Sequence, residues 1–314
     1  METAAKSLAN RQAGTIVITG AFSYTGKYAT RLLLDRGHQV RTLTNHPCRE
    51  NPFGAQVQVF PYNFDRPHKL AASLRGASTL TNTYWVRFPH RSSNYETAVQ
   101  NTVALINAAK DAGVNRIVHV SIANPSPQSS LGYYRGKARL ESVIRDSGLS
   151  YAILRPTVIF GREDILINNI AWFVRRFPVF GIPGDGRYCV QPIYVEDMAD
   201  LIVDAVERED SYVVDAIGPE IFTFQELLRL IGAKLGRPVS EIHLPIVLVY
   251  LVTRITGWFV DDVILTWEEY KGLVGGLLVS DKPPSGKTRL SEWLSENRDH
   301  VGVRYTSELA RHFR

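Results

Sequence analysis

Tyr133 and Lys137 are the pair whose residue types and spacing best suit proton transfer. Residues four apart in a helix lie on one face, so this phenol and amine would be neighbours. A phenol with a pKa of about 10 exchanges protons poorly near neutrality unless its anion is stabilised. A nearby ammonium group stabilises that anion. The pair therefore predicts a general acid or base, although an ordinary amphipathic helix also produces this spacing.

A serine hydroxyl is expected near this pair. Ser121 ends the predicted strand 116–121 and precedes Tyr133 by twelve residues. In an open parallel sheet, ligands bind beyond the carboxyl ends of the strands, so this hydroxyl would lie at the ligand-binding edge. There it would hydrogen-bond a substrate carbonyl. The alternative is a cap for the turn at 124–127.

A strand, a tight turn and a helix within 15–36 predict a phosphate site. The β-branched run 15–19 ends at Gly20, and the helical pattern 28–36 follows Gly26. The first amides of a helix lack intrahelical partners, and the helix dipole favours an anion beside them. Ser23 stands where the usual dinucleotide fingerprint has its middle glycine. A purely conformational turn is the alternative, because many strand-to-helix turns hold two glycines.

These residues need a scaffold that brings several strand ends to one edge. Strands and helices alternate through the first half of the chain, which predicts a doubly wound parallel sheet and an α/β fold. After the first strand, the expected strands are 39–44, 57–60, 79–83, 116–121, 151–154 and 212–216, and the expected helices include 94–112, 131–147 and 195–207.

The alternation breaks after residue 160. We therefore expect a dinucleotide-binding domain formed by 1–160 and 191–217. The segments 161–190 and 218–314 would form a smaller, mostly helical substrate-binding region, with a glycine and proline turn cluster at 181–186.

The composition is that of an ordinary globular protein, with 45% hydrophobic and 21% charged residues. The net charge of +5 comes from scattered basic residues, so we expect anionic small molecules rather than nucleic acid as ligands. Cys48 and Cys189 predict neither a disulfide framework nor a zinc site, and no metal is expected. A reducing, cytoplasmic location fits this cysteine usage.

The segment 244–260 comes nearest to a membrane-spanning run, but Pro245 and Arg254 interrupt it. We expect no integral membrane segment. We expect this helix to be buried, or to dock peripherally on a membrane or an apolar partner.

Together these motifs resemble the short-chain dehydrogenase/reductase superfamily. The resemblance rests on Thr19-Gly20-Ala21 and Thr25-Gly26, on Ser121, on Tyr133-x-x-x-Lys137, and on Arg-Pro-Thr-Val-Ile-Phe-Gly at 155–161. The segments 134–138 and 191–199 are most similar to the extended or atypical branch. Its nucleoside-diphosphate-sugar-epimerase-like proteins include the NAD(P)H-binding accessory subunit of respiratory complex I. The resemblance covers about residues 14–220 and implies a Rossmann domain.

The resemblance also implies a Ser-Tyr-Lys site. Tyr133 would exchange a proton with the substrate while hydride passes to or from the nicotinamide. Lys137 would hold the nicotinamide ribose and lower the Tyr133 pKa, and Ser121 would orient the substrate oxygen. The implied cofactor-binding positions are Gly20, Phe22, Ser23, Tyr24, Thr25 and Gly26 at the turn; Arg41, Thr44, Asn45 and His46 around the second strand; Asn63 and Phe64 beside the adenine; Asn82 and Thr83 near the ribose and phosphates; Lys137; and Pro156 and Thr157 near the carboxamide.

Two departures from the family pattern bear on the ligands. Thr44 stands where NAD-preferring members carry an acidic residue, and Arg41 and Arg49 lie nearby in the sequence, so NADP is expected rather than NAD. The arginine with which related enzymes bind a nucleotide-sugar pyrophosphate is missing near Val190, which argues against such a substrate.

The sequence predicts two alternative functions. The first is an NADP(H)-dependent oxidoreductase or epimerase that acts on a carbonyl or secondary alcohol of a small-molecule substrate. The second is an NAD(P)H-binding sensor or assembly subunit with little turnover. The sequence leaves the oligomeric state open, with a homodimer as one option.

Overall fold

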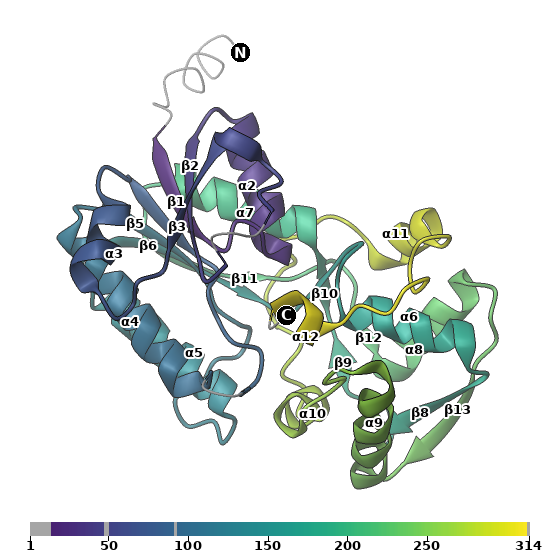
Figure 1. Cartoon of the computed structure of the whole chain (residues 1–314). Coiled ribbons are helices and arrows are strands. Elements are labelled where there is room, and N and C mark those ends of the chain that lie inside the picture. Colours follow the sequence, from purple (N-terminus) through teal and green to yellow (C-terminus); the bar gives the residue numbers. More distant parts are fainter. Residues whose placement is uncertain (1–13, 47–49, 91–92, 313–314) are drawn as a thin grey trace.

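Seven parallel strands form the centre of the computed structural model, which describes residues 14–46, 50–90 and 93–312 (Figure 1). Their spatial order is β11-β6-β5-β4-β1-β2-β3. The order reverses between β1 and β4, and doubly wound sheets bind ligands at such a reversal. In chain order the strands are β1 (Thr15–Thr19), β2 (Gln39–Thr44), β3 (Val57–Pro61), β4 (Thr79–Asn82), β5 (Arg116–Val120), β6 (Ser150–Pro156) and β11 (Tyr212–Ala216). The predicted doubly wound α/β fold is confirmed.

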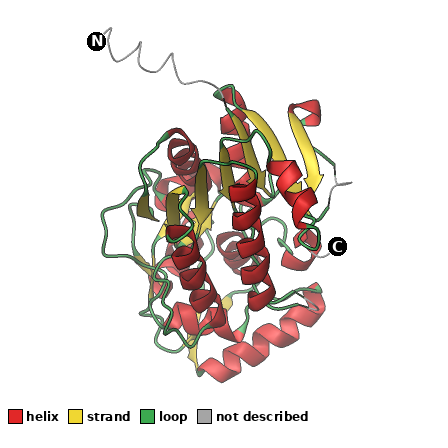
Figure 2. Ribbon diagram, turned by 90° about the vertical axis from the view of Figure 1, so that its left-hand side faces the viewer, coloured by secondary structure: helices red, strands yellow, loops and turns green. Residues whose placement is uncertain are grey.

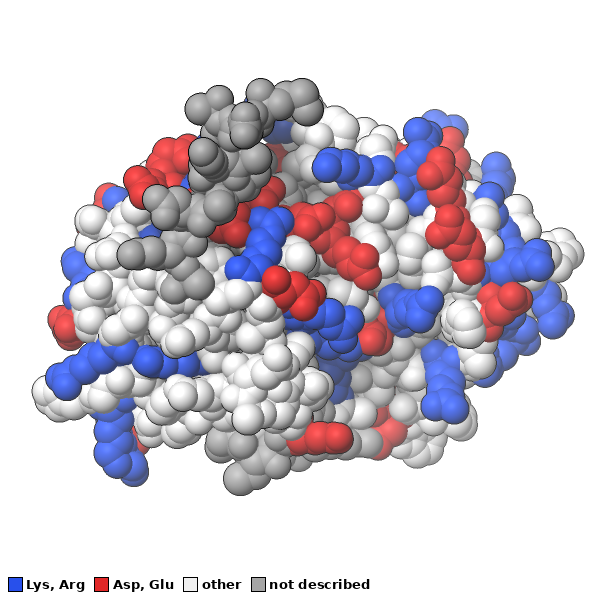
Figure 3. Space-filling view, turned by 90° about the horizontal axis from the view of Figure 1, so that it is seen from above, with Lys and Arg blue, Asp and Glu red and all other residues white. Residues whose placement is uncertain are grey.

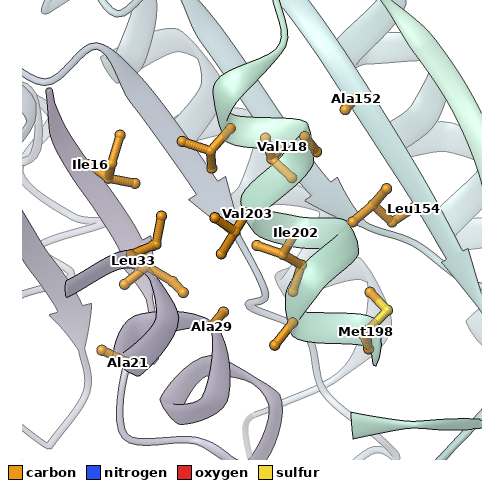
Figure 4. Close-up of a cluster of buried hydrophobic side chains, with 14 of the residues drawn as sticks. Ile16, Ala21, Ala29, Leu33, Val118, Ala152, Leu154, Met198, Ile202 and Val203 are labelled. Carbon is orange, nitrogen blue, oxygen red and sulfur yellow. The ribbon is translucent and has the colours of Figure 1, made fainter. Parts of the chain in front are cut away.

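Helices cover both faces of this sheet. On one face lie α2 (Tyr24–Asp35) and α7 (Val195–Glu207); on the other lie α3 (Pro67–Leu74), α4 (Tyr95–Asp111) and α5 (Gly132–Arg145), the layer in front in Figure 2. Alternate side chains of a strand point to opposite faces. Ile16 and Ile18 therefore pack beneath α2 and α7, whereas Val17 packs with the other layer. Figure 4 shows Ile16 in the same cluster as Leu33 of α2 and Val203 of α7. Burial on both faces explains the continuous apolar runs of these strands.

A third hydrophobic core lies outside the sheet. It includes Phe160, Tyr188 and Trp293, and α6 (Leu166–Arg176), α8 (Phe224–Lys234) and α11 (Leu290–Asn297) surround it. The remaining elements are η1 (Gly54–Gln56), α9 (Ile246–Val260), α10 (Trp267–Val274) and α12 (Glu308–His312), together with three strand pairs: β7 (Val158–Phe160) with β10 (Pro192–Tyr194), β9 (Cys189–Val190) with β12 (Phe222–Thr223), and β8 (Val179–Pro183) with β13 (Ser240–Leu244).

The expected turn cluster at 181–186 is partly wrong. β8 continues through Pro183 and pairs in parallel with β13, so the turn begins only at Gly184, where φ is 62°. Such short strands depend on a partner far along the chain, and a local pattern does not predict them. The division into a dinucleotide-binding and a substrate-binding unit stays a prediction.

Charges of both signs are interspersed on the face seen from above (Figure 3). Among the described residues, no helix has the length and apolarity needed to cross a bilayer. The thiol of Cys189 is free and half-buried, whereas Cys48 and Arg49 lie outside the described residues.

Candidate functional site

The glycine-rich turn joins β1 to α2 at the carboxyl edge of the sheet. Gly20 has a φ of 67°, and its carbonyl accepts a hydrogen bond from the Ser23 amide at 2.8 Å. α2 begins at Tyr24, four residues before the helical pattern expected at 28–36. The Ser23 hydroxyl accepts a hydrogen bond from the Gly26 amide at 3.3 Å. The residue that departs from the fingerprint therefore caps the helix.

The close approach of helix and strand requires Gly26. A Cβ atom at this position would lie 2.1 Å from the Gly20 carbonyl oxygen. Within the described residues, the Tyr24 and Thr25 amides of the first helical turn have no hydrogen-bond partner. Unpartnered amides at a helix N-terminus fit an anionic pyrophosphate. The turn thus fits the phosphates of a dinucleotide. The side chain of Phe22, which belongs to the same turn, is half-buried.

Polar side chains tie together the carboxyl ends of β1, β4 and β5. The Thr19 hydroxyl donates to Asn82 Oδ1 at 3.1 Å and accepts from the Thr83 amide at 2.7 Å. Asn82 Nδ2 lies 3.0 Å from Nδ1 of His119. Burial lowers the pKa of His119 well below its usual value, with a smaller contribution from Lys137, so this imidazole is neutral. Asn82 and Thr83 are thereby fixed at the edge where the ribose and phosphates are expected.

An aromatic cluster follows β3. The Phe64 ring centroid lies 4.7 Å from that of Tyr62 and 5.3 Å from that of Tyr84. Asn63, between them, has a φ of 48°, in the left-handed region that asparagine tolerates. Asn63 and Phe64 therefore lie at a strand end of the ligand-binding edge, where the adenine is expected.

The end of β2 offers polar groups, but Arg41 does not contribute to them. The Thr44 hydroxyl accepts from the His46 amide at 3.1 Å, and Asn45 and His46 are exposed. The Arg41 guanidinium donates to the Arg75 carbonyl at 2.7 Å. Arg75 precedes β4, so this contact lies at the amino edge, opposite the glycine-rich turn. The expectation that Arg41 serves a 2′-phosphate is therefore wrong for this structure.

The side-chain amine of Lys137 is buried and makes its contacts with other residues of the protein. Its side chain is 2% exposed, and Nζ donates to the Val120 carbonyl at 2.7 Å. The same nitrogen lies 4.6 Å from the ring centroid of Trp85. Burial lowers the pKa of Lys137 to about 7, although Glu141 opposes this shift. The amine is thus only partly protonated near neutrality.

Tyr133 lies among other aromatic side chains. Its ring centroid is 5.6 Å from that of Trp85 and 5.8 Å from that of Tyr95. Burial raises the pKa of Tyr133, Tyr134 and Glu269 raise it further, and Arg87 opposes them. The resemblance implied the opposite, a pKa lowered by Lys137. Tyr133 and Lys137 do lie on one face of α5, since both contact Trp85.

Ser121 takes part in a different network. Its hydroxyl donates to Glu141 Oε1 at 2.7 Å, and Glu141 also accepts from Arg155 and Arg145. Burial disfavours the Glu141 carboxylate, but these hydrogen bonds lower its pKa below the ordinary value. Glu141 follows Tyr133 by eight residues, about 12 Å along the helix. The structure therefore does not bring Ser121 together with Tyr133 as the resemblance implied.

The Ser121→Ala variant tests this placement. Losing one buried hydrogen bond to a charged acceptor should lower the free energy of unfolding by about 1–2 kcal/mol, measured by urea titration. The Kd for NADPH should change by less than about twofold, because the hydroxyl faces Glu141. A tenfold weaker Kd with unchanged stability would instead place Ser121 at the ligand.

The remaining expected contacts lie after β6. The Thr157 hydroxyl donates to the Gln191 carbonyl, and the Pro156 carbonyl accepts from the Ala123 amide at 2.8 Å. A segment around α12 reaches the same edge, since the Arg311 guanidinium lies 5.6 Å from the Tyr24 ring centroid and donates to the Glu163 carbonyl. Arg87 Nη1, after β4, lies 3.5 Å from Glu308.

Sequence reasoning missed Glu141 and the position of Trp85 against Lys137. Glu141 follows Lys137 by one helical turn, so the spacing of four that selected Tyr133 and Lys137 also contains it. For the contact between Trp85 and Lys137 we find no local sequence signal.

The fold and the glycine-rich turn define the class as NAD(P)-binding proteins of Rossmann type. A family model described as NAD(P)H-binding matches residues 20–169. The structure of an NADPH-dependent quinone oxidoreductase from Escherichia coli, complexed with NADPH, superposes with a TM-score of 0.71, 22% identity and coverage of 90% of this chain and 99% of that one. The triphenylmethane reductase of Citrobacter sp., complexed with NADP(H), gives a TM-score of 0.70, 17% identity and coverage of 90% and 99%.

Curated relatives extend this likeness at the sequence level. Subunit 9 of the NADH dehydrogenase (ubiquinone) 1 alpha subcomplex, mitochondrial, from Arabidopsis thaliana is 25% identical over 284 residues, 84% of this chain and 70% of that protein. The Mus musculus protein of the same name is 31% identical over 254 residues, 76% of this chain and 66% of that protein. In its matched NAD(P)H-binding segment and in its fold, the chain is similar to proteins of the short-chain dehydrogenase/reductase superfamily, in its extended, atypical branch.

Proposed function

We propose that this chain binds NADP(H) with little or no turnover, as a redox sensor or as a subunit of a larger assembly. One observation carries the proposal: the polar groups that would drive proton transfer are bonded within the protein. The Ser121 hydroxyl donates to Glu141, and Lys137 Nζ donates to the Val120 carbonyl beside Trp85. A phenol whose pKa is raised by burial is a poor general base near neutrality.

The end of β2 supports NADP over NAD. A carboxylate there would hydrogen-bond the ribose 2′-hydroxyl of NAD and repel the 2′-phosphate of NADP. Thr44, Asn45 and His46 carry no negative charge, and the latter two are exposed. The preference rests on these residues and not on Arg41.

The names of the relatives support the assembly role. Those from Arabidopsis thaliana and Mus musculus are named as subunits of a dehydrogenase subcomplex. A dinucleotide bound across three strand ends would stabilise the native state, because it would not bind the unfolded chain. The stability of such a subunit would then depend on the concentration of the cofactor.

A reductase or epimerase acting on a small-molecule carbonyl or secondary alcohol is the second candidate. It is favoured because Tyr133 and Lys137 share one face of α5 and both contact Trp85. Movement of the Trp85 indole would free the amine for a ribose hydroxyl.

A titration with a turnover assay separates the two functions. We expect NADPH fluorescence to show saturable binding, tighter than for NADH. We expect no consumption of NADPH above the buffer rate with a panel of aldehydes, ketones and quinones. Wild type and Tyr133→Phe should behave alike in both measurements.

The matched control is Tyr134→Phe, because Tyr134 neighbours Tyr133 on α5 and is buried. NADPH consumption that is lost in Tyr133→Phe and retained in Tyr134→Phe would establish the reductase instead. Failure of both dinucleotides to bind would contradict the proposal altogether.

A further inference from the structure

The helix α9 exposes the kind of side chain that globular proteins bury. It lies beside β8 and the parallel β13, at the lower edge of the molecule in Figure 1. Isolated exposed apolar residues need no explanation, but a contiguous patch marks an interaction site. The exposed fractions are 59% for Val247, 51% for Leu251, 48% for Val252, 61% for Ile255, 81% for Trp258 and 77% for Phe259.

α9 is apolar over most of its surface, and one side of it faces away from the protein. These six residues recur at spacings of three and four, so they lie along one side of α9. The buried residues of α9 are Val249 and Gly257, and the Thr253 hydroxyl donates back to the Tyr250 carbonyl at 2.9 Å. α9 therefore packs on the protein through Val249, Tyr250 and Gly257, and the six exposed apolar residues face outward.

Shape and area argue against a second copy of the chain as the occupant. Exposure is greatest at Trp258 and Phe259, near the end of the helix, so the face is a projecting ridge. Thirteen helical residues span only about 20 Å. Such a ridge falls well short of the roughly 800 Å² per partner that a stable protein interface buries. A bilayer accommodates a ridge without a complementary surface.

Charge and residue type favour a bilayer. α9 contains one charged residue, Arg254, and no carboxylate. Tryptophan is enriched at the boundary between headgroups and acyl chains, and an arginine beside apolar residues extends its charge to the headgroups. With 15 residues, α9 is shorter than the roughly 20 needed to cross the hydrocarbon core. It would therefore lie in the interface plane.

We propose that α9 binds the surface of an anionic lipid bilayer, with the ridge at Val247, Leu251, Val252, Ile255, Trp258 and Phe259 inserted among the acyl chains and Arg254 at the headgroups. This contact leaves the glycine-rich turn free, since α9 lies beside β8 and β13 and not at the carboxyl edge of the central sheet. It holds whether or not the chain turns over a substrate.

Vesicle flotation of the full chain tests the proposal. Wild-type protein should float with vesicles of phosphatidylcholine and phosphatidylglycerol at a 3:1 ratio, and less with pure phosphatidylcholine. The Trp258→Ser/Phe259→Ser variant should lose at least tenfold in bound fraction. The control Ile221→Ser/Val303→Ser removes two other exposed apolar side chains, 54% and 47% exposed, and should bind like wild type.

Circular dichroism and light scattering of the same proteins complete the test. If the double variant does not fold, Ile255→Ser replaces it, with at least a threefold loss expected. Wild-type protein that stays unbound with both vesicle types overturns the proposal. A wild-type dimer that the variant converts to monomer, without vesicle binding, overturns it in favour of a second copy.

Discussion

Gly26→Ala should weaken NADPH binding by at least about 100-fold and lower the free energy of unfolding by about 2–4 kcal/mol. The new Cβ would lie 2.1 Å from the Gly20 carbonyl oxygen and 2.9 Å from its carbon, and both are backbone atoms that cannot move alone. α2 must therefore shift away from β1, which costs packing and strain. The same shift moves the Tyr24 and Thr25 amides away from the phosphates, and a loss of about 2.7 kcal/mol is a factor of 100 in Kd.

Gly232→Ala is the matched control for this variant. Gly232 is also a helical glycine, in α8, and its Cβ would lie 2.9 Å from the Arg237 carbonyl oxygen. It packs in the third core, away from the glycine-rich turn. We expect a stability loss of about 1–3 kcal/mol in urea and an unchanged NADPH Kd. If Gly26→Ala bound NADPH like this control, the phosphates would lie elsewhere.

Lys137→Met should change how stability depends on pH. The pKa of Lys137 is lowered in the folded protein to about 7, whereas an unfolded lysine keeps its proton to about pH 10. Between these values the unfolded chain binds more protons, so this lysine makes wild-type stability rise with pH. Without cofactor, the unfolding free energy of wild type relative to Lys137→Met should rise by about 2–3 kcal/mol from pH 6 to pH 9.

Lys110→Met is the control, because Lys110 is exposed on the last turn of α4. Its ammonium stays in water in both states, so its effect on unfolding in urea should be equal at pH 6 and pH 9. An equal effect of Lys137→Met at both pH values would mean that Lys137 is a solvated ammonium. Lys137 would then be available to bind a ribose hydroxyl, and this result would support the reductase or epimerase function.

The central sheet was predictable because its strands are buried on both faces. An apolar β-branched run between turn residues is then a local signal, and the predicted bounds of β2 and β11 match the structure. The short strands β7 to β10, β12 and β13 carry no such signal, because each depends on pairing with a distant segment. The glycine-rich turn was predictable since Gly20 and Gly26 are each required by backbone geometry.

Side-chain directions at the site were less predictable. Sequence spacing placed Tyr133 and Lys137 on one helical face, and the structure confirms that. The direction of the Ser121 hydroxyl depends on Glu141 and Arg155, which come from a helix and the next strand. The direction of the Arg41 side chain was equally unpredictable, because a long side chain on a strand can reach either edge of the sheet. Its hydrogen bond to the Arg75 carbonyl is a tertiary contact without a local pattern.

The contacts of Arg311 have a consequence for biosynthesis. Arg311 meets Tyr24 and Glu163, and Glu308 meets Arg87. The Tyr24 contact joins residues 287 positions apart. At about 5–20 residues per second, translation separates the two by roughly 15–60 s. The last strand of the central sheet, β11, ends at Ala216, so a nascent chain passes through a stage in which every strand of the sheet has been made and the Arg311 contacts are still missing.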